Sequence, residues 1–464
     1  MRPRAALLAV VLCWTGLTAC AVGPKYQRPA VTVPEATSNA PASLADQAWW
    51  EVFQDDALKS LIAEALKNGY DVRLAAWRVE EARANAGVAR AAAFPQAQGQ
   101  AQAGRVQTSR FSPGGGGVGN GIQVNLGLSW ELDLWGRIRL LNDAARAQVL
   151  ASEEARRGVL LSLVAEVATS YFQLRELDVE LAVARRTTGA FQETYDLFDR
   201  RLRGGAASAL ETSSAEASLA STAANIPDLE RLIAAQENRL AFLVGRNPGP
   251  IQRGAILTDQ SLPPEVPPGL PSALLERRPD LRQTEEELIA ANAEVGVAEA
   301  DFFPHISLTA AFGGVAPQLS ELFRDGKTWS VGGGLLTPVF QGRRLENQRR
   351  AAVARWEQAR VRYEQSVTNA FHEVATSLVA YQKLAAVEKE RARAVAADRE
   401  AVRLANTRYV AGLSAYLEVL QAQQQLYPAE NLLAQARYNR LATLVELYRA
   451  LGGGWKLSDQ EIPR

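Results

Sequence analysis

Very few of the side chains that bind transition metals or act as nucleophiles occur in this chain of 464 residues. It has two histidines, two cysteines and one methionine, so a transition-metal site or a disulfide framework has little material. The same scarcity of histidine and cysteine argues against a Cys–His or Ser–His catalytic centre. Neither His305 nor His372 has partners at the spacing of metal ligands. The 51 basic residues equal the 51 acidic ones, which gives no attraction to nucleic acid. We expect no catalytic residues, no metal, no cofactor and no nucleic acid, and both histidines are expected to be structural.

Long apolar runs are also missing, because beyond the N-terminus none approaches the ~18 residues of a membrane-spanning helix. At the N-terminus, two arginines precede the apolar run 5–14 and the sequence LTAC at 17–20, which predicts a signal peptide over residues 1–19. LTAC resembles a bacterial lipobox, by which Cys20 would become the lipidated first residue. The alternative is an ordinary cleaved signal with an incidental cysteine. Ala21, by analogy with bacterial sorting, favours the outer membrane.

The chain contains a tandem repeat. Phe-Pro at 94–95 recurs 209 residues later at 303–304, and GVA at 87–89 recurs at the same offset. Glycine and glutamate at 205 and 211 recur at 412 and 418. Near-constant offsets over more than a hundred residues indicate duplication of one structural unit, with the Pro- and Gly-rich stretch 246–271 as linker.

Each half follows the same predicted plan: a helix, two strands, a long helix and a returning helix. We place the repeats at 71–245 and 272–451, after an N-terminal segment 20–70 and before a tail 452–464. The returning helices are expected to break or bend near Pro227 and Pro428. The long helices fit a dimeric coiled coil or a curved wall of neighbouring helices, and their length favours the wall. The predicted elements are 71–93, 96–107, 122–134, 137–203 and 207–244 in the first half and 280–301, 305–314, 329–340, 342–411 and 414–451 in the second.

The segment QVNLGLSWELDLWGR at 123–137 alternates strictly between polar and apolar residues. This period of two predicts a strand with one apolar and one polar face. A half-buried sheet of a soluble domain is one interpretation. The strand lengths and the very polar second face favour a water-filled membrane barrel, whose lumen would be lined by Gln123, Asn125, Glu131 and Asp133. Four strands cannot close such a barrel, so several chains must contribute to it.

Four segments carry a family resemblance: CAVGPKYQRP (20–29), WWEVFQDDALKSLIAEALKNGYDVRLA (49–75), RRPDLRQTEEELIAANAEVGVAEADFFPHISL (277–308) and RALGGGW (449–455). With them the chain resembles outer-membrane efflux factors of the TolC/OprM type, particularly the lipoprotein (NodT-like) branch of RND efflux systems. The resemblance implies a mainly α fold with a membrane β-barrel portion. It also implies a homotrimer with a 12-strand β-barrel, four strands per chain, continuous with a 12-helix periplasmic α-barrel.

What the resemblance implies for function is a passive exit duct, not an enzyme. The duct would sit in outer membrane lipid, anchored through a covalent lipid on Cys20, and extend into the periplasm. Its partners would be a periplasmic adaptor (membrane fusion) protein and an inner-membrane RND-type pump. We expect small toxic molecules as cargo; the alternatives are a type I protein secretion tunnel and a metal-ion efflux duct.

The same resemblance implies a gate at the helical turns. Tyr409 falls at the family's gating tyrosine, and Glu211 and Glu418 fall where the family commonly has an acidic residue. Three copies of Glu418 would form a carboxylate ring that favours cations; a solvated helix carboxylate is the alternative. The chain departs from the charged residues of the family's latch at three positions: Ser414, Gln421 and Gln424. A partly neutralised latch is therefore expected.

Overall fold

The computed structural model describes residues 22–31, 53, 55–111, 116–260 and 275–453. These residues form two compact units. The sheet unit contains the described residues of Met1–Ala30, Arg78–Glu153 and Gln283–Gln365, and the helical unit contains the rest. The predicted signal peptide, Cys20 and much of the predicted linker lie outside the described residues.

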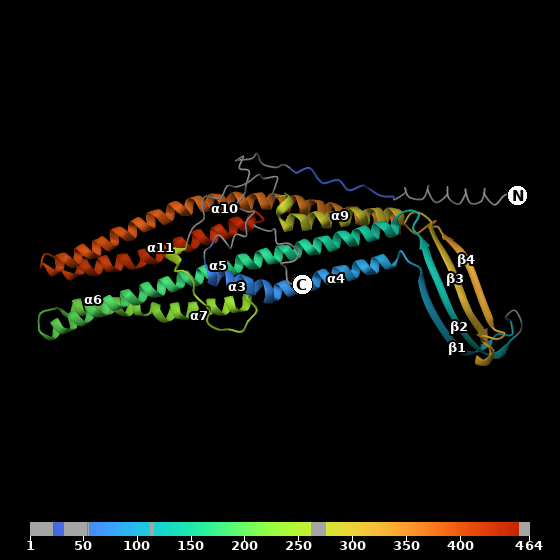
Figure 1. Cartoon of the computed structure of the whole chain (residues 1–464), viewed down its shortest axis with the longest axis horizontal. Coiled ribbons are helices and arrows are strands. Elements are labelled where there is room, and N and C mark those ends of the chain that lie inside the picture. Colours follow the sequence, from blue (N-terminus) through green and yellow to red (C-terminus); the bar gives the residue numbers. More distant parts are fainter. Residues whose placement is uncertain (1–21, 32–52, 54, 112–115, 261–274, 454–464) are drawn as a thin grey trace. The chain divides into compact units, whose positions relative to one another are not determined.

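The order of the elements repeats once along the chain (Figure 1). A short helix, α3 (Asp56–Asn68), precedes the first copy. The repeated order is helix, two strands, long helix and returning helix. The first copy contains α4 (Tyr70–Ala91), β1 (Gln96–Thr108), β2 (Gly117–Leu132), α5 (Arg137–Arg203), α6 (Ala209–Ala223) and α7 (Asn225–Leu243), and the second contains α9 (Pro279–Ala300), β3 (His305–Ala316), β4 (Lys327–Leu336), α10 (Arg344–Val410) and α11 (Tyr416–Ala450).

The two prolines of the returning helices act differently. The segment predicted as one helix at 207–244 is two helices, α6 and α7, which meet at Ala224. A proline ring displaces the carbonyl four residues before it, and for Pro227 that carbonyl belongs to the last residue of α6. The second returning helix, α11, runs through Pro428 without a break.

The predicted strand bounds differ most from the structure at β2 and β4. β2 begins at Gly117, five residues before the predicted start, because the glycine-rich stretch 117–121 pairs with the end of β1. It ends at Leu132, so Asp133 is not on the strand. β4 ends at Leu336, before the predicted end at 340, since Pro338 has no N–H to continue a ladder.

The four strands form one antiparallel sheet in the order β1-β2-β3-β4. Cross-strand partners in an antiparallel pair share a face. The register pairs Gln100 with Asn125 and Gln102 with Gln123, so one face is lined mostly by uncharged polar and small residues, with Glu131 near its end. The opposite face is apolar, and its large side chains are exposed; they include Leu126, Leu128, Trp130, Leu308, Phe312, Trp329, Val331 and Leu335.

The hydrophobic core lies in the helical unit. It is built from α3, α5, α7 and α11 and includes the fully buried Leu58, Val164, Phe172, Leu240 and Leu444. Side chains at helical spacing on each helix supply this core. The loop after α7 also contributes to it through Ile251 and Leu257.

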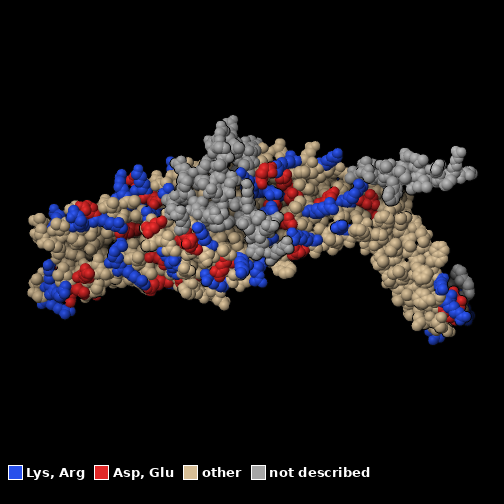
Figure 2. All heavy atoms as spheres, viewed as in Figure 1, with Lys and Arg blue, Asp and Glu red and all other residues tan. Residues whose placement is uncertain are grey.

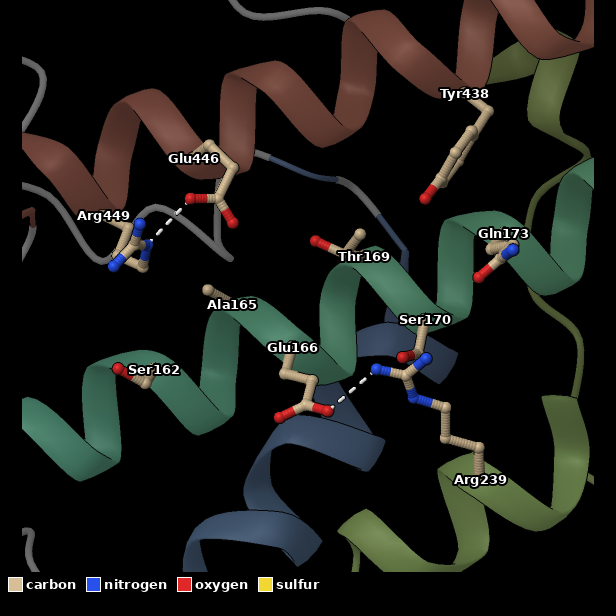
Figure 3. Close-up of a pocket in the computed structure, with 10 residues that line it drawn as sticks. All are labelled: Ser162, Ala165, Glu166, Thr169, Ser170, Gln173, Arg239, Tyr438, Glu446 and Arg449. Atoms are coloured by element: carbon tan, nitrogen blue, oxygen red, sulfur yellow. Dashed lines mark hydrogen bonds and ion pairs between the residues drawn. The ribbon is translucent and has the colours of Figure 1, made fainter. Parts of the chain in front are cut away.

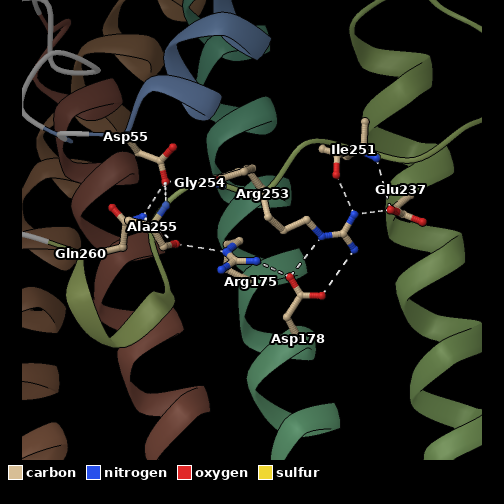
Figure 4. Close-up of polar contacts among 10 residues, drawn as sticks. Asp55, Arg175, Asp178, Glu237, Ile251, Arg253, Gly254, Ala255 and Gln260 are labelled. Carbon is tan, nitrogen blue, oxygen red and sulfur yellow. Dashed lines mark hydrogen bonds and ion pairs between the residues drawn. The ribbon is translucent and has the colours of Figure 1, made fainter.

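A buried carboxylate joins three segments of this core (Figure 4). Asp55 is 1% exposed and caps α3 by accepting the backbone N–H groups of its second and third residues. Its Oδ2 accepts the Tyr171 hydroxyl at 2.8 Å and the Gln260 side-chain amide at 2.7 Å. Burial and the hydrogen bond to Asp55 raise the pKa of Tyr171, which stays a donor. A buried charge requires such compensation, so Asp55 fixes α3, α5 and the loop after α7 together.

A second polar chain continues from this point along α5 (Figure 4). Arg175 donates to the Ala255 carbonyl at 3.1 Å and pairs with Asp178. Asp178 also accepts from Arg253, which donates to Glu237 of α7 as well. Both basic side chains therefore have acidic partners where α5, α7 and the loop meet.

Asp55→Ala is expected to lower the free energy of unfolding by about 2–4 kcal/mol, because it removes a helix cap and leaves buried donors unpaired. Thermal unfolding followed by helical circular dichroism measures this. Asp56→Ala is the matched control, since the neighbouring carboxylate is fully exposed and its removal should change little. Equal effects of the two substitutions would contradict the role given to Asp55.

Glu176 on α5 is a second buried carboxylate, with 7% exposure. Burial, together with the charge of Glu180 one turn further along the helix, raises the pKa of Glu176 to about 7. Burial also raises the pKa of Glu180. Tyr438 of α11 lies within electrostatic reach of Glu176, and its own pKa is raised, chiefly by burial.

The elevated pKa of Glu176 gives a pH-dependent stability. The folded value of about 7 exceeds the ordinary 4.5, so the folded state holds a proton that the unfolded state has lost between these pH values. The free energy of unfolding should therefore fall as pH rises from 4.5 through 7. Glu176→Gln should reduce this slope, leaving the part that Glu180 contributes, and should be more stable than the parent at pH 8 by about 1–3 kcal/mol. Denaturant titrations at pH 5 and pH 8 test this, with the exposed Glu193→Gln on the same helix as control. An unchanged slope in Glu176→Gln would refute it.

Candidate functional site

Two helical turns with matching backbones lie in the helical unit, one between α5 and α6 and one between α10 and α11. Gly205 and Gly412 have φ angles of 72° and 71°, a left-handed conformation that glycine adopts without a Cβ penalty. The amide of the next residue bonds to the carbonyl five residues back, from Ala206 to Arg201 at 2.7 Å and from Leu413 to Arg408 at 2.9 Å. Both turns are therefore Schellman helix ends.

The helices that leave these turns begin differently. In the first turn Ser208 and Glu211 form a capping box, with each side chain accepting the other's backbone N–H. The bond from the Ser208 N–H lowers the pKa of Glu211. In the second turn Ala415 occupies the N-cap and has no side-chain cap. Glu418 instead lies 3.6 Å from Arg408 across the turn. The two glutamates occupy equivalent repeat positions but have different partners.

Tyr409 is the centre of a cluster that joins the two repeats. Arg201 of α5 donates to its hydroxyl, and the guanidinium carbon lies 5.6 Å from the Tyr409 ring centroid. The ring of Tyr416 lies edge-on to Tyr409 at 5.0 Å and to Phe198 of α5 at 4.8 Å. The Tyr416 hydroxyl bonds to Thr194. Four polar or aromatic contacts thus hold α5 against the second turn.

Sequence reasoning missed the partners of Tyr409 on α5. One signal was present: Arg201 and Arg408 are equivalent at the repeat offset of 207, and each contacts one of the predicted gate residues. The three departures from the latch pattern lie apart from this cluster. Gln421 is exposed, and Gln424 donates to Ser218 of α6 at 3.0 Å. The Ser414 hydroxyl oxygen is buried with no partner among the described residues.

The two acidic residues predicted to line a lumen form polar contacts at the junction of β2 with α5. Glu131 forms a two-point ion pair with Arg137, at 3.0 and 2.7 Å, and lies 3.2 Å from Nδ1 of His305. Asp133 accepts the backbone N–H groups at the start of α5, those of Ile138 and Arg139, both at 2.9 Å. Both carboxylates therefore stabilise the β2–α5 turn, and their place in a barrel lumen stays a prediction.

The other predicted positions on the sheet lie as the alternation implies. Gln123 and Asn125 lie on the polar face of the sheet. His305 lies within hydrogen-bond distance of Glu131, a structural position, and His372 is exposed on α10.

A cavity of about 410 Å³ lies within the helical unit (Figure 3). Its charges are paired with one another: Arg239 with Glu166 at 3.0 Å, and Arg449 with Glu446 at 2.8 Å. The pairing leaves no excess charge to attract an ionic ligand. Across the described ranges, no group of three or more His, Cys, Asp or Glu side chains is placed to hold a metal ion. Among the described helices, none is long and apolar enough to span a membrane.

Comparison with known proteins identifies the class. The sequence model of the outer membrane efflux protein family matches residues 61–246 and 270–453, so the chain belongs to this family. The cation efflux system protein CusC of Escherichia coli O6:H1 is 34% identical over 448 residues, covering 95% of this chain and 97% of CusC. The antibiotic efflux pump outer membrane protein ArpC of Pseudomonas putida is 34% identical over 453 residues, covering 95% of this chain and 93% of ArpC.

Solved structures agree. The CmeC outer membrane channel of Campylobacter jejuni superposes with a TM-score of 0.88 at 25% identity, covering 95% of this chain and 97% of CmeC. The predicted family and the mainly helical, duplicated fold class are confirmed, as is the role of an outer membrane efflux protein. The gate assignment of Tyr409, Glu211, Glu418 and Gln421 stays a prediction.

If the Tyr409 cluster closes a gate, Tyr409→Phe should open it. The Arg201–Tyr409 hydrogen bond is exposed and contributes about 0.5–1 kcal/mol, so the ratio of open to closed time should rise by roughly two- to fivefold. Single-channel recording in planar bilayers measures this ratio. Arg201→Gln should reproduce the effect, whereas Arg200→Gln, which removes the exposed neighbour, should not. Parent-like recordings from both Tyr409→Phe and Arg201→Gln would exclude this gate.

Proposed function

We propose that the chain is the outer-membrane exit duct of a tripartite efflux system. It would passively conduct small toxic molecules delivered by an inner-membrane RND-type pump and a periplasmic adaptor, and it would catalyse no reaction. The observation that carries this proposal is the sheet, which has one exposed apolar face, one polar face whose carboxylate, Glu131, is paired with Arg137, and two edge strands.

The sheet fits a membrane barrel shared among copies. In lipid, an unpaired sheet edge leaves backbone groups without water or protein partners, so β4 of one copy must pair with β1 of another. Three copies give twelve strands, an even number within the range of known membrane barrels. The apolar side of β2, from Ile122 to Leu132, extends about 34 Å and rises about 24 Å at a 45° tilt. That height matches the apolar band of an outer-membrane barrel.

The cargo is the point on which the relatives differ. ArpC is named for antibiotics and CusC for cations. The polar face of the sheet presents amide and hydroxyl groups, whereas soft metal ions prefer thiolate, thioether and imidazole ligands. We therefore favour organic molecules over metal ions, with metal-ion efflux as the second candidate. Cys20 is the proposed lipid attachment site, with the helical part of the chain in the periplasm.

Purified protein is expected to form trimers and to produce discrete conductance steps in planar bilayers. Cells that lack the gene should lose tolerance to apolar organic toxins and keep their tolerance to copper and silver salts. Growth in graded concentrations of each compound separates the two cargoes, and re-expression of the chain is the control.

Three results would count against parts of the proposal. A complete absence of conductance, even in Glu418→Ala, would contradict the duct. Loss of metal tolerance alone would transfer the assignment to metal-ion efflux. Cation selectivity that is unchanged in a Glu211→Gln/Glu418→Gln variant would contradict the carboxylate ring.

A further inference from the structure

Charged side chains are confined to the two ends of the sheet. At the end where the strands join the long helices, Glu131 is paired with Arg137. At the other end, where the turns connect β1 with β2 and β3 with β4, the strands carry Arg105 and Lys327. Between these ends the sheet carries no charged side chain, and Figure 2 shows an uninterrupted tan surface there.

Both cations point to the apolar face of the sheet. Arg105 alternates with Ala103 and Ala101 along β1 and is opposite Asn120 on β2. Lys327 lies two residues beyond Trp329 on β4, on the same face. Tryptophan is enriched where a membrane barrel meets the lipid headgroups. Lys327 is nearer to the β3–β4 turn than this tryptophan, so it would lie at the depth of the lipid headgroups on the lipid-facing side. Arg105 is at a similar level on β1, because its partner Asn120 precedes Ile122, where the apolar run of β2 starts.

These two side chains are available for a ligand. Both are exposed, and neither forms an ion pair within the part of the chain that the structure describes. The described residues at this end include two more cations, Arg110 and Arg324. Against these four there are two acidic residues, Glu321 and Asp325, in the β3–β4 connection. The end is therefore positively charged overall, as recognition of an anionic headgroup requires.

We propose that Arg105 and Lys327 bind the phosphate groups of a phosphorylated lipid in the outer leaflet of the membrane. This inference rests on the proposed function, because it requires the sheet to cross the membrane with these turns outward. In a closed ring, β4 of one copy lies beside β1 of the next. Arg105 and Lys327 then occupy the same end of adjacent strands, where one phosphate group can contact both.

The test compares lipid binding by the full-length protein and by an Arg105→Gln/Lys327→Gln variant. The probe is diphosphoryl lipid A, counted on the assembled protein by native mass spectrometry and titrated in phosphatidylcholine vesicles. Each basic residue near an anionic surface contributes roughly fivefold to binding, so the double variant should bind about 25-fold more weakly. Lys389→Gln/Arg391→Gln, which removes two exposed cations from α10, is the matched control and should bind like the parent.

Two further measurements identify the ligand. Monophosphoryl lipid A should bind more weakly than the diphosphoryl form, and inorganic phosphate at millimolar concentration should not displace either. Parent-like lipid A binding by the double variant overturns the proposal, as does displacement by inorganic phosphate, which would indicate a site for the free ion. If the double variant fails to insert, the two single variants replace it, each with an expected loss of about fivefold.

Conductance recorded on the same preparations separates this inference from the proposed function. If channels form but lipid A binding does not depend on Arg105 and Lys327, the proposed lipid site is wrong and the proposed duct still stands. If the parent protein forms no channels, the proposed function as a duct is wrong.

Discussion

Backbone N–H and C=O groups along the outer edges of β1 and β4 have no neighbouring strand within the described chain. In water they would be solvated, but next to lipid each unpaired group costs several kcal/mol. The apolar face of the same sheet is exposed and carries Trp329 and Val331 at 78% and 77% exposure, which favours lipid over water. The two requirements conflict in a single copy. Only pairing with further copies satisfies both, so assembly is a condition for membrane insertion.

Duplication supplies the helical unit with two turns of the same backbone, and later divergence gives them different chemistry. The Schellman ends at Gly205 and Gly412 are equivalent in dihedral angle and hydrogen bonding. A single difference at the N-cap, Ser208 against Ala415, determines whether the glutamate three residues later closes a capping box or is free to reach Arg408. The repeat therefore determines the backbone conformation of both turns. The side chain at the N-cap determines which glutamate is available for an ion pair across its turn.

Local patterns in the sequence predict the helices and strands of this fold and the faces of its sheet. They do not predict contacts between residues that are far apart in the sequence. Period-two alternation placed Gln123 and Asn125 on the polar face, and the bounds predicted for α5 coincide with those observed, since glycines flank it at 136 and 204. The early start of β2 was missed because a run of glycines shows no alternation. The bonds from Tyr171 to Asp55 and from Arg201 to Tyr409 join residues 116 and 208 positions apart. No local spacing reports such pairs.

The distribution of charge indicates where the chain can discriminate among solutes. The polar face of the sheet offers amides and hydroxyls, which hydrate a passing molecule without selecting its charge. The ion pair of Glu131 with Arg137 neutralises the charge at the strand–helix junction. The helical turns are different, because Arg408 and Glu418 are both exposed and 3.6 Å apart, and exposed pairs of this kind are weak. Such contacts can exchange partners without loss of the fold. In the proposed duct, closure and charge preference would therefore belong to the turns, and the sheet would provide a wetted passage.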